Sequence, residues 1–323
     1  MFFLPERINH CVYMHNQHSP RRLAVVALHL ACIVVFATGC ASLAPLPDTD
    51  IYLADLDAAT MTLSNVRNIT QRRGYDNQPA FSANDSVLYY VASVSNAPTD
   101  VFRYTIATGE RTRITTTAEA EFSPTPMNDG KSLSVVRVGK PGAADEEYTE
   151  SQQLWRYTLD GRPIAPIIGA RRVGYHCWVS DGTVALFIVG NDHTRTPHTL
   201  VAADLASRQT TLVASSIGRT IRISPGGALT YVDTSDSTRS VVTAIAPNNE
   251  TTKPLLQLPG GTEDFAWLPD GRILVSNGTE FLYWDGTISS SLRPIQAPQL
   301  PTGKIGRIVV SHGGRVVAFV VTK

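Results

Sequence analysis

The sequence predicts an all-β protein, a six-bladed β-propeller whose N-terminal strands complete the last blade. Three observations lead to this fold class. One phrase, an apolar strand, a tight turn and a second apolar strand, recurs six times. The copies are about 45 residues apart, a period typical of propeller blades. Finally, the two ends of the repeat region are complementary halves of one copy.

Each copy opens with two strands joined by a turn. The second residues of the six turns are separated by 45, 52, 45, 44 and 43 residues, and they are Asp85, Gly130, Gly182, Gly227, Gly271 and Gly314. Asp-Gly and Gly-Gly between apolar runs are typical of two-residue hairpin turns, because Gly accepts positive φ. A third apolar stretch follows, as in DVFRYTIATGE from Asp100, and then a weaker fourth, as in RTRITT. Four antiparallel strands in each period predict one blade.

The ends of the repeat region determine the number of blades. The last copy stops at Lys323 after two strands, whereas DIYLADLDAATMTLSNVRNIT from Asp50 matches a third and fourth strand only. Joining these halves gives six closed blades without an open sheet edge. We therefore expect residues 51–56 to pair beside residues 316–321, and we expect deletion of residues 50–57 to open the ring.

The N-terminal region is typical of a secretory signal. Residues 21–40, RRLAVVALHLACIVVFATGC, have a basic start, an apolar run of about 15 residues and small residues before a Cys. The run is short for a membrane span, and an uncleaved signal anchor is the alternative. The ending Ala37-Thr38-Gly39-Cys40 resembles a bacterial lipobox, which implies cleavage before Cys40 and lipid on its thiol. Translation starts at Met1 or Met14.

These features divide the chain into a signal peptide at 1–39, a lipidated tether at 40–49 and the propeller at 50–323. Acylation at Cys40 would attach the protein stably to a membrane without a spanning helix. Ala41, where an Asp would resemble an inner-membrane retention signal, favours the outer membrane over the inner one. We therefore expect a periplasmic, lipid-anchored protein.

Composition and charge limit the class of function. The 323-residue chain is 43% hydrophobic and carries 28 basic and 28 acidic residues. Residues 1–39 hold three of the basic residues and one acidic residue, which leaves 25 and 27. A nearly neutral chain with no basic stripe disfavours nucleic-acid binding. Cys177 would be the single unmodified thiol after lipidation, so the mature protein would have no internal disulfide.

The irregular spacing of 52 identifies the loops where a site would form. The long loop from Gly139 carries Asp145, Glu146, Glu147 and Glu150, and the next long loop, from Gly190, carries Asp192, His193, Arg195 and His198. Tyr175, His176 and Cys177 begin the strand between these two loops. The three histidines are types that bind metal. The sequence nevertheless predicts no metal site and no cofactor, because a solvated acidic loop and a buried strand explain the same residues.

A second set of candidates follows from aligning the six turns. We call the second residues of the six turns the ruler residues. The residues seven positions before them should face the central channel, and they are Gln78, Ser123, Tyr175, Thr220, Asp264 and Arg307. Within this column Asp264 and Arg307 lie on adjacent blades, where they would form an ion pair. Phe81, Trp178 and Trp267 form another column three residues further on, and we expect them to pack between blades. The candidate face for a ligand or partner thus comprises Tyr175, His176, His193, His198, Asp264 and Arg307.

The phrases FSANDSVLYYVAS, ISPGGALTYV and WLPDGRILV resemble the repeat of TolB-type propellers over nearly all of residues 50–323. The resemblance implies a rigid propeller with one loop-rich face, used in such proteins as a docking platform, a peptidase gate or sometimes an enzyme. No Gly-x-Ser-x-Gly, His-Glu-x-x-His or Cys-x-x-Cys motif is present. The sequence therefore favours a non-enzymatic scaffold that binds a protein or peptide in the cell envelope. The alternative is a hydrolase, lyase or small-ligand binder that uses a polar site on that face.

Overall fold

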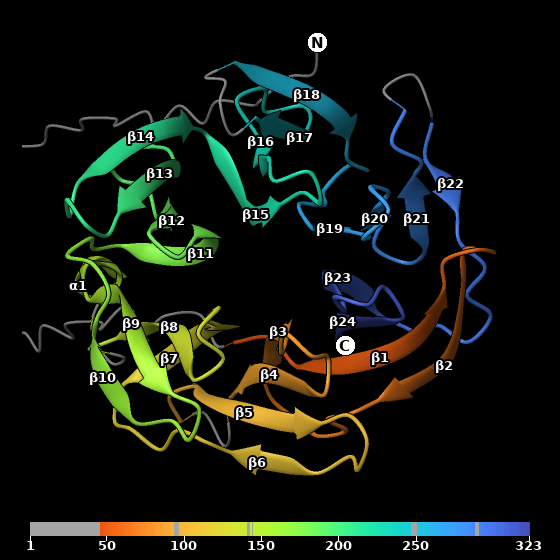
Figure 1. Cartoon of the computed structure of the whole chain (residues 1–323), viewed down its shortest axis with the longest axis horizontal. Coiled ribbons are helices and arrows are strands. Elements are labelled where there is room, and N and C mark those ends of the chain that lie inside the picture. The colour runs from red at the N-terminus through yellow and green to blue at the C-terminus, as the bar shows by residue number, and fades with distance from the viewer. Residues whose placement is uncertain (1–45, 94–96, 141–142, 144, 247–250, 288–290) are drawn as a thin grey trace, which may run out of the picture. The chain divides into compact units, whose positions relative to one another are not determined.

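The described part of the chain folds into six four-stranded sheets that are arranged in a ring (Figure 1). The structure is a computed structural model that describes residues 46–323, except 94–96, 141–142, 144, 247–250 and 288–290. The predicted signal peptide, Cys40 and both candidate start residues lie outside the described residues. The six-bladed all-β fold predicted from the repeat is confirmed.

Each sheet is antiparallel and runs from an inner strand at the channel to an outer strand. The first three blades, in this order, are β3 (Asp76–Phe81), β4 (Val87–Ala92), β5 (Asp100–Thr105) and β6 (Arg111–Arg113); β7 (Ala120–Pro126), β8 (Ser132–Val138), β9 (Gln152–Thr158) and β10 (Pro163–Pro166); and β11 (Val173–Ser180), β12 (Thr183–Ile188), β13 (Thr199–Asp204) and β14 (Thr210–Ser215). The next two are β15 (Ile217–Ile223), β16 (Leu229–Asp233), β17 (Val241–Ile245) and β18 (Thr252–Gln257); and β19 (Phe265–Trp267), β20 (Ile273–Ser276), β21 (Phe281–Trp284) and β22 (Arg293–Pro294).

The sixth blade is shared between the two ends of the propeller. Its strands, from inside to outside, are β23 (Lys304–Val310), β24 (Val316–Thr322), β1 (Thr49–Asp57) and β2 (Thr62–Asn68). The ladder between β1 and β24 runs without interruption from Thr49 opposite Thr322 to Asp55 opposite Val316. The predicted pairing of residues 51–56 beside residues 316–321 is therefore confirmed, and no edge is left at the junction of the two ends.

The turns between the first two strands of each blade differ from the two-residue turns that the sequence suggested. In five blades the ruler residue donates its backbone N–H to the carbonyl three residues earlier, as Gly271 does to Leu268 at 3.0 Å. These five ruler residues have positive φ, from 56° at Asp85 to 90° at Gly271. The geometry is that of a type I turn followed by a left-handed residue. The connection is therefore three or four residues long, and Gly is favoured at its end.

The apolar core lies in the seams between blades. One cluster joins Ile51 and Leu53 of β1 to Leu88 and Tyr90 of β4. Phe81 belongs to this cluster, while Trp178 and Trp267 pack against clusters that join their own blades to the preceding ones. The packing predicted for this aromatic column is therefore confirmed. Because each seam buries side chains from two blades, the rigid ring fixes the positions of the inner strands.

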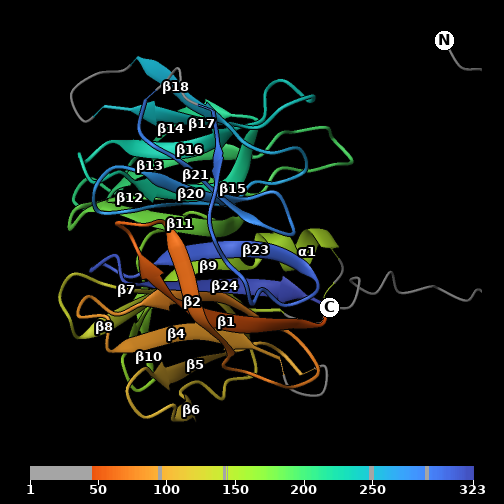
Figure 2. The same ribbon diagram turned by 90° about the vertical axis from the view of Figure 1, so that its right-hand side faces the viewer.

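A single helix, α1 (Asp145–Glu150), interrupts the described strands, in the long loop between β8 and β9. It lies on the same side of the sheets as Lys323 at the C-terminus (Figure 2). Within the described residues, no helix has both the length and the apolar character needed to cross a membrane.

Candidate functional site

The six residues of the predicted channel column line one cavity of about 300 Å³, which we call the channel cavity. Each comes from, or directly precedes, the inner strand of a different blade. The structure thus gives this column the channel position expected from the spacing of the turns. The column members are Gln78, Ser123, Tyr175, Thr220, Asp264 and Arg307.

The inner strands are bulged where the column residues lie. The register of β3 against β4 shifts between Asn77 and Ala80, and Gln78 between them has a φ of 55°. Ser123 and Arg307 occupy equivalent bulges with φ of 51° and 50°. A non-glycine residue in this left-handed region costs roughly 1 kcal/mol or more. The bulges re-aim these residues out of the regular pleat, and all three line the channel cavity.

Asp264 forms the central ion pair of the cavity with Arg219. The Arg219 Nη2 donates to Asp264 Oδ2 at 2.6 Å and its Nε donates to Oδ1 at 3.4 Å. Thr220 also donates to Oδ1, at 3.3 Å. Burial raises the pKa of Asp264, but the charges of Arg219 and Arg307 outweigh it and hold that pKa below its usual range. Asp264 is therefore ionised at neutral pH.

The expected ion pair between Asp264 and Arg307 is wrong. Arg307 instead donates from Nη2 to the Tyr175 hydroxyl at 2.7 Å, with its guanidinium 4.7 Å from the centre of the Tyr175 ring. The bulge directs Arg307 across the channel to Tyr175 of the third blade rather than sideways to its neighbour. Arg219, the residue before Thr220 in the chain, forms the ion pair with Asp264 instead.

Arg219 and Arg222 are channel residues that the sequence reasoning missed. Arg222 lines the channel cavity two residues after Thr220. Successive side chains of a strand alternate between its faces, so a residue two positions after a column member faces the same side. The residues two positions after each column member form a second ring, and Arg222 is its charged member. Extending the column by this period of two would therefore have found it. The other lining residues of that ring are Ala80, Thr125, Cys177 and Val309.

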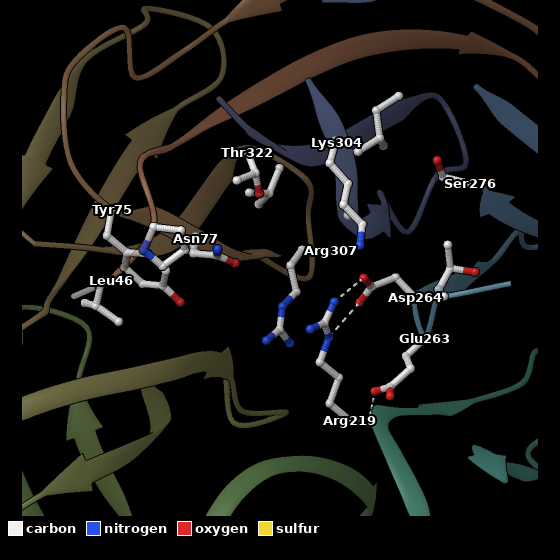
Figure 3. A pocket seen from close by; sticks show the side chains of 16 residues that line it. Leu46, Tyr75, Asn77, Arg219, Glu263, Asp264, Ser276, Lys304, Arg307 and Thr322 are labelled. Carbon is white, nitrogen blue, oxygen red and sulfur yellow. Dashed lines mark hydrogen bonds and ion pairs between the residues drawn. The ribbon is translucent and has the colours of Figure 1, made fainter. Parts of the chain in front are cut away.

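A second cavity of about 360 Å³, the mouth pocket, opens where the inner strands begin (Figure 3). Figure 3 shows the Arg219 and Arg307 side chains extending into it, with Lys304 above Asp264. Glu263 accepts the backbone N–H of Arg219 at 3.1 Å. Leu46, which is 45% exposed, lines the same pocket. The first described residue of the chain therefore lies at the channel mouth.

A third cavity, the aromatic side pocket, lies between the two long loops and the channel mouth and measures about 440 Å³. Tyr148 of α1 and His198 line it together with Tyr175. The His198 ring packs 4.7 Å from the ring of Phe187, which contacts Tyr175 edge-on at 5.4 Å. The two loops and the Tyr175 strand thus converge.

Arg172 connects the two loops. It donates to Glu146 at 2.5 Å, to Glu150 at 2.8 Å and to the Gly190 carbonyl at 2.6 Å. Asn191 of the second loop also donates to Glu146, at 2.9 Å. Glu146 and Glu150 therefore share Arg172 as a basic partner, and the loops form one wall of the side pocket.

The three candidate histidines occupy different environments. His176 is buried on β11, where its Nε2 lies 2.6 Å from the Ser134 hydroxyl, and burial lowers its pKa to about 3. His193 and His198 are both exposed after Gly190, and the His198 ring also packs on Phe187. The described residues contain no group of three or more His, Cys, Asp or Glu side chains that could hold a metal ion.

Comparison with known proteins supports the fold. No family model matches the chain, and neither does any curated protein. Among solved structures, one assigned as TolB from Agrobacterium tumefaciens aligns with a TM-score of 0.63 at 11% identity, covering 86% of this chain and 99% of that one. A gluconolactonase from Xanthomonas campestris aligns with 0.58 at 12% identity, covering 87% and 98%.

An oligogalacturonate lyase in complex with manganese also aligns, with a TM-score of 0.52 at 16% identity, covering 80% of each chain. The resemblance to TolB-type propellers predicted from the repeat is thus confirmed for the fold. The aligned structures include both TolB and enzymes, so the likeness leaves the activity open.

Proposed function

We propose that this chain is a lipid-anchored periplasmic protein, held at the outer membrane, that binds a protein or peptide partner without catalysis. The partner docks on the loop-rich face, which carries the channel mouth, the aromatic side pocket and the two connected loops. The observation that carries this proposal is the convergence of these features with Leu46 at one face. Aromatic rings beside arginines are the groups enriched at protein interfaces.

The position of Leu46 also orients the proposed docking face. Cys40 is six residues before Leu46, and six extended residues span at most roughly 20 Å. The nine residues of β1 lead away from the mouth over roughly 30 Å toward the opposite face. A lipid on Cys40 would therefore hold the loop-rich face toward the membrane, and the expected partner lies at that membrane.

The anchor is tested by substituting Cys40→Ser and fractionating cells. We expect the wild-type protein in the outer-membrane fraction and the variant in the soluble periplasm. Equal membrane association of the two proteins would contradict the lipid anchor.

The docking face is tested with a photo-cross-linking residue at Leu46, 45% exposed at the mouth, and at Val179, 38% exposed near the opposite turns. Both positions are exposed and apolar, so they form a matched pair. We expect a discrete adduct from position 46 that is lost when residues 140–149 are deleted, and none from position 179. Equal adducts from both positions, or none from position 46, would contradict docking at this face.

A small-ligand binder is the second candidate function, and the channel cavity favours it. That cavity lies below the mouth and is about 300 Å³, at the small end of the range for ligand sites. A small ligand there and a protein at the face could be bound by the same molecule.

A further inference from the structure

The channel cavity contains more positive than negative charge. Its lining includes three arginines, Arg219, Arg222 and Arg307, and one carboxylate, Asp264. The carboxylate is taken by Arg219. Among the described residues, Arg222 and Arg307 have no carboxylate oxygen within ion-pair distance; Arg222 donates to the Ile221 carbonyl at 3.2 Å and Arg307 to the Tyr175 hydroxyl.

The other titratable groups of the cavity do not offset this charge. Burial lowers the pKa of His176 to about 3 and raises the pKa of Cys177 to about 11, so both are neutral at pH 7. Burial also lowers the pKa of Arg222, although a guanidinium stays protonated in proteins. Enclosed like charges without a counter-ion are unfavourable. The cavity is therefore suited to an anion.

Two residues of the lining, Ser123 and His176, each contain a buried polar atom without a hydrogen-bond partner among the described residues, namely Ser123 Oγ and His176 Nδ1. His176 is 7% exposed. Such atoms are rare in folded proteins and are unfavourable when left unpaired. A ligand that pairs with them would remove this cost.

The network around Ser134 determines what His176 can accept. The Trp178 Nε1–H donates to the Ser134 hydroxyl at 2.9 Å, and this hydroxyl donates to the Thr125 carbonyl at 3.2 Å. A hydroxyl has one hydrogen to give, and Ser134 can place it either on the Thr125 carbonyl or on His176 Nε2, which lies 2.6 Å away. With the hydrogen on the Thr125 carbonyl, His176 donates from Nε2 and its Nδ1 is an acceptor without a partner; the ligand proposed below requires this tautomer.

We propose that the channel cavity binds a small hydroxycarboxylate. Its carboxylate takes the free donors of Arg222 and Arg307, because the planar guanidinium matches a carboxylate in paired hydrogen bonds. Its hydroxyl donates to His176 Nδ1. The volume of about 300 Å³ suits a ligand of a few carbon atoms. The inference does not depend on the protein partner or on the anchor.

The test is calorimetric titration of the full-length, detergent-solubilised protein with L-malate, with succinate, which lacks the hydroxyl, and with inorganic phosphate. We expect one malate per chain, bound roughly five- to tenfold more tightly than succinate because of the hydroxyl. Phosphate should bind more weakly than malate. Tighter binding of phosphate, equal binding of succinate and malate, or no binding of malate by the wild-type protein would each overturn the proposal.

Substitution localises the site. Arg222→Met and Arg307→Gln should each weaken malate binding by about tenfold or more, since each removes a charged donor. Arg162→Gln, at a guanidinium 77% exposed on a distant turn, should leave it unchanged. Malate should also raise the melting temperature of the wild-type protein but not that of Arg222→Met. Unchanged binding by both channel variants would place malate elsewhere and overturn the assignment, whereas loss of cross-linking from Leu46 would concern only the docking proposal.

Discussion

The closing blade and the channel cavity use β-strands for opposite purposes. In the closing blade, Ile51, Leu53 and Phe319 are fully buried, and β1 and β24 are paired along their whole shared length. In the channel cavity, the inner strands are bulged and hold arginines without carboxylate partners. Buried apolar side chains and paired backbone, as in the closing blade, stabilise the fold. Bulged strands and arginines without a counter-charge, as in the channel cavity, destabilise it. Departures from folding preference are typical of binding sites, and the channel is therefore where function is to be sought.

Removing the closing strand is the change with the largest expected effect. Deletion of residues 50–57 exposes the unpaired edge of β24 and the apolar side chains that β1 covers. We expect no cooperative thermal unfolding and aggregation on size-exclusion chromatography. Deletion of residues 140–149, which removes most of α1, should leave cooperative unfolding in place. A folded monomer after deletion of residues 50–57 would show that the closing strand is not needed to hold the ring together.

Asp264→Asn removes the carboxylate that offsets the channel arginines. Asp264 is buried and its partner Arg219 would be left without a counter-charge, so we expect a loss of about 3 kcal/mol in the free energy of unfolding. Because the pKa of folded Asp264 is below its ordinary value, this contribution is present at neutral pH and is lost below about pH 4. Denaturant titration measures it.

The control for Asp264 is Asp270→Asn. Asp270 pairs with Arg272 at 2.5 Å, but its side chain is 46% exposed, so its loss should change stability by less than about 1 kcal/mol. A smaller effect at Asp264 than at Asp270 would show that the cavity charges contribute little to folding.

Glu121 lies in a seam between blades, and it should make the folding stability depend on pH in a different range from Asp264 of the channel. It is fully buried between the first two blades, and burial, together with the nearby charge of Asp100, raises its pKa to about 7. Between about pH 4.5 and 7 the folded state therefore holds a proton that the unfolded state has lost, so stability should fall as the pH rises through this window. The fall is at most about 3 kcal/mol.

Glu121→Gln should flatten the stability profile between pH 5 and 7. Glu119→Gln serves as the control, because Arg137 helps to hold the pKa of Glu119 below its usual value and its effect lies at more acidic pH. Melting temperatures across this range measure both. A wild-type profile that rises with pH in this window would contradict the assignment.

Apart from the control variants, Trp267→Phe is expected to have the smallest effect on stability. The indole N–H donates to the Thr230 hydroxyl of the preceding blade at 3.0 Å, and the ring packs in the seam. Phe keeps most of the packing but loses the hydrogen bond, so we expect a loss of about 1 kcal/mol in the free energy of unfolding. Urea titration of the two proteins would measure it, and an unchanged midpoint would show that the bond contributes nothing across the seam.

Periodicity explains which features could be predicted from the sequence. The turn residues recur at fixed spacing, so they locate the blades, the closure and the column that contains Tyr175 and Asp264. Arg222 follows from the same rule once the strand period of two is continued. Whether Asp264 pairs with Arg219 or with Arg307 depends on how the bulged strands orient the two arginine side chains. The spacing of residues in the sequence does not determine that orientation.

The loops have no period, and their convergence could not be predicted. The contacts of Arg172 with Glu146 and Glu150 join segments from two blades, and neither loop repeats elsewhere in the chain. His193 and His198 lie five residues apart in the same loop and were therefore both candidates. Only the His198 side chain packs on Phe187, which the sequence does not indicate.

The most direct test of the central claim, that the channel is a binding site held by a closed ring, is a crystal structure of the protein grown with L-malate. The account predicts malate inside the channel cavity, with its carboxylate within hydrogen-bond distance of Arg222 and Arg307 and its hydroxyl at His176 Nδ1. A structure from saturated crystals with only water at these arginines, or with malate bound solely on the outer surface, would contradict it.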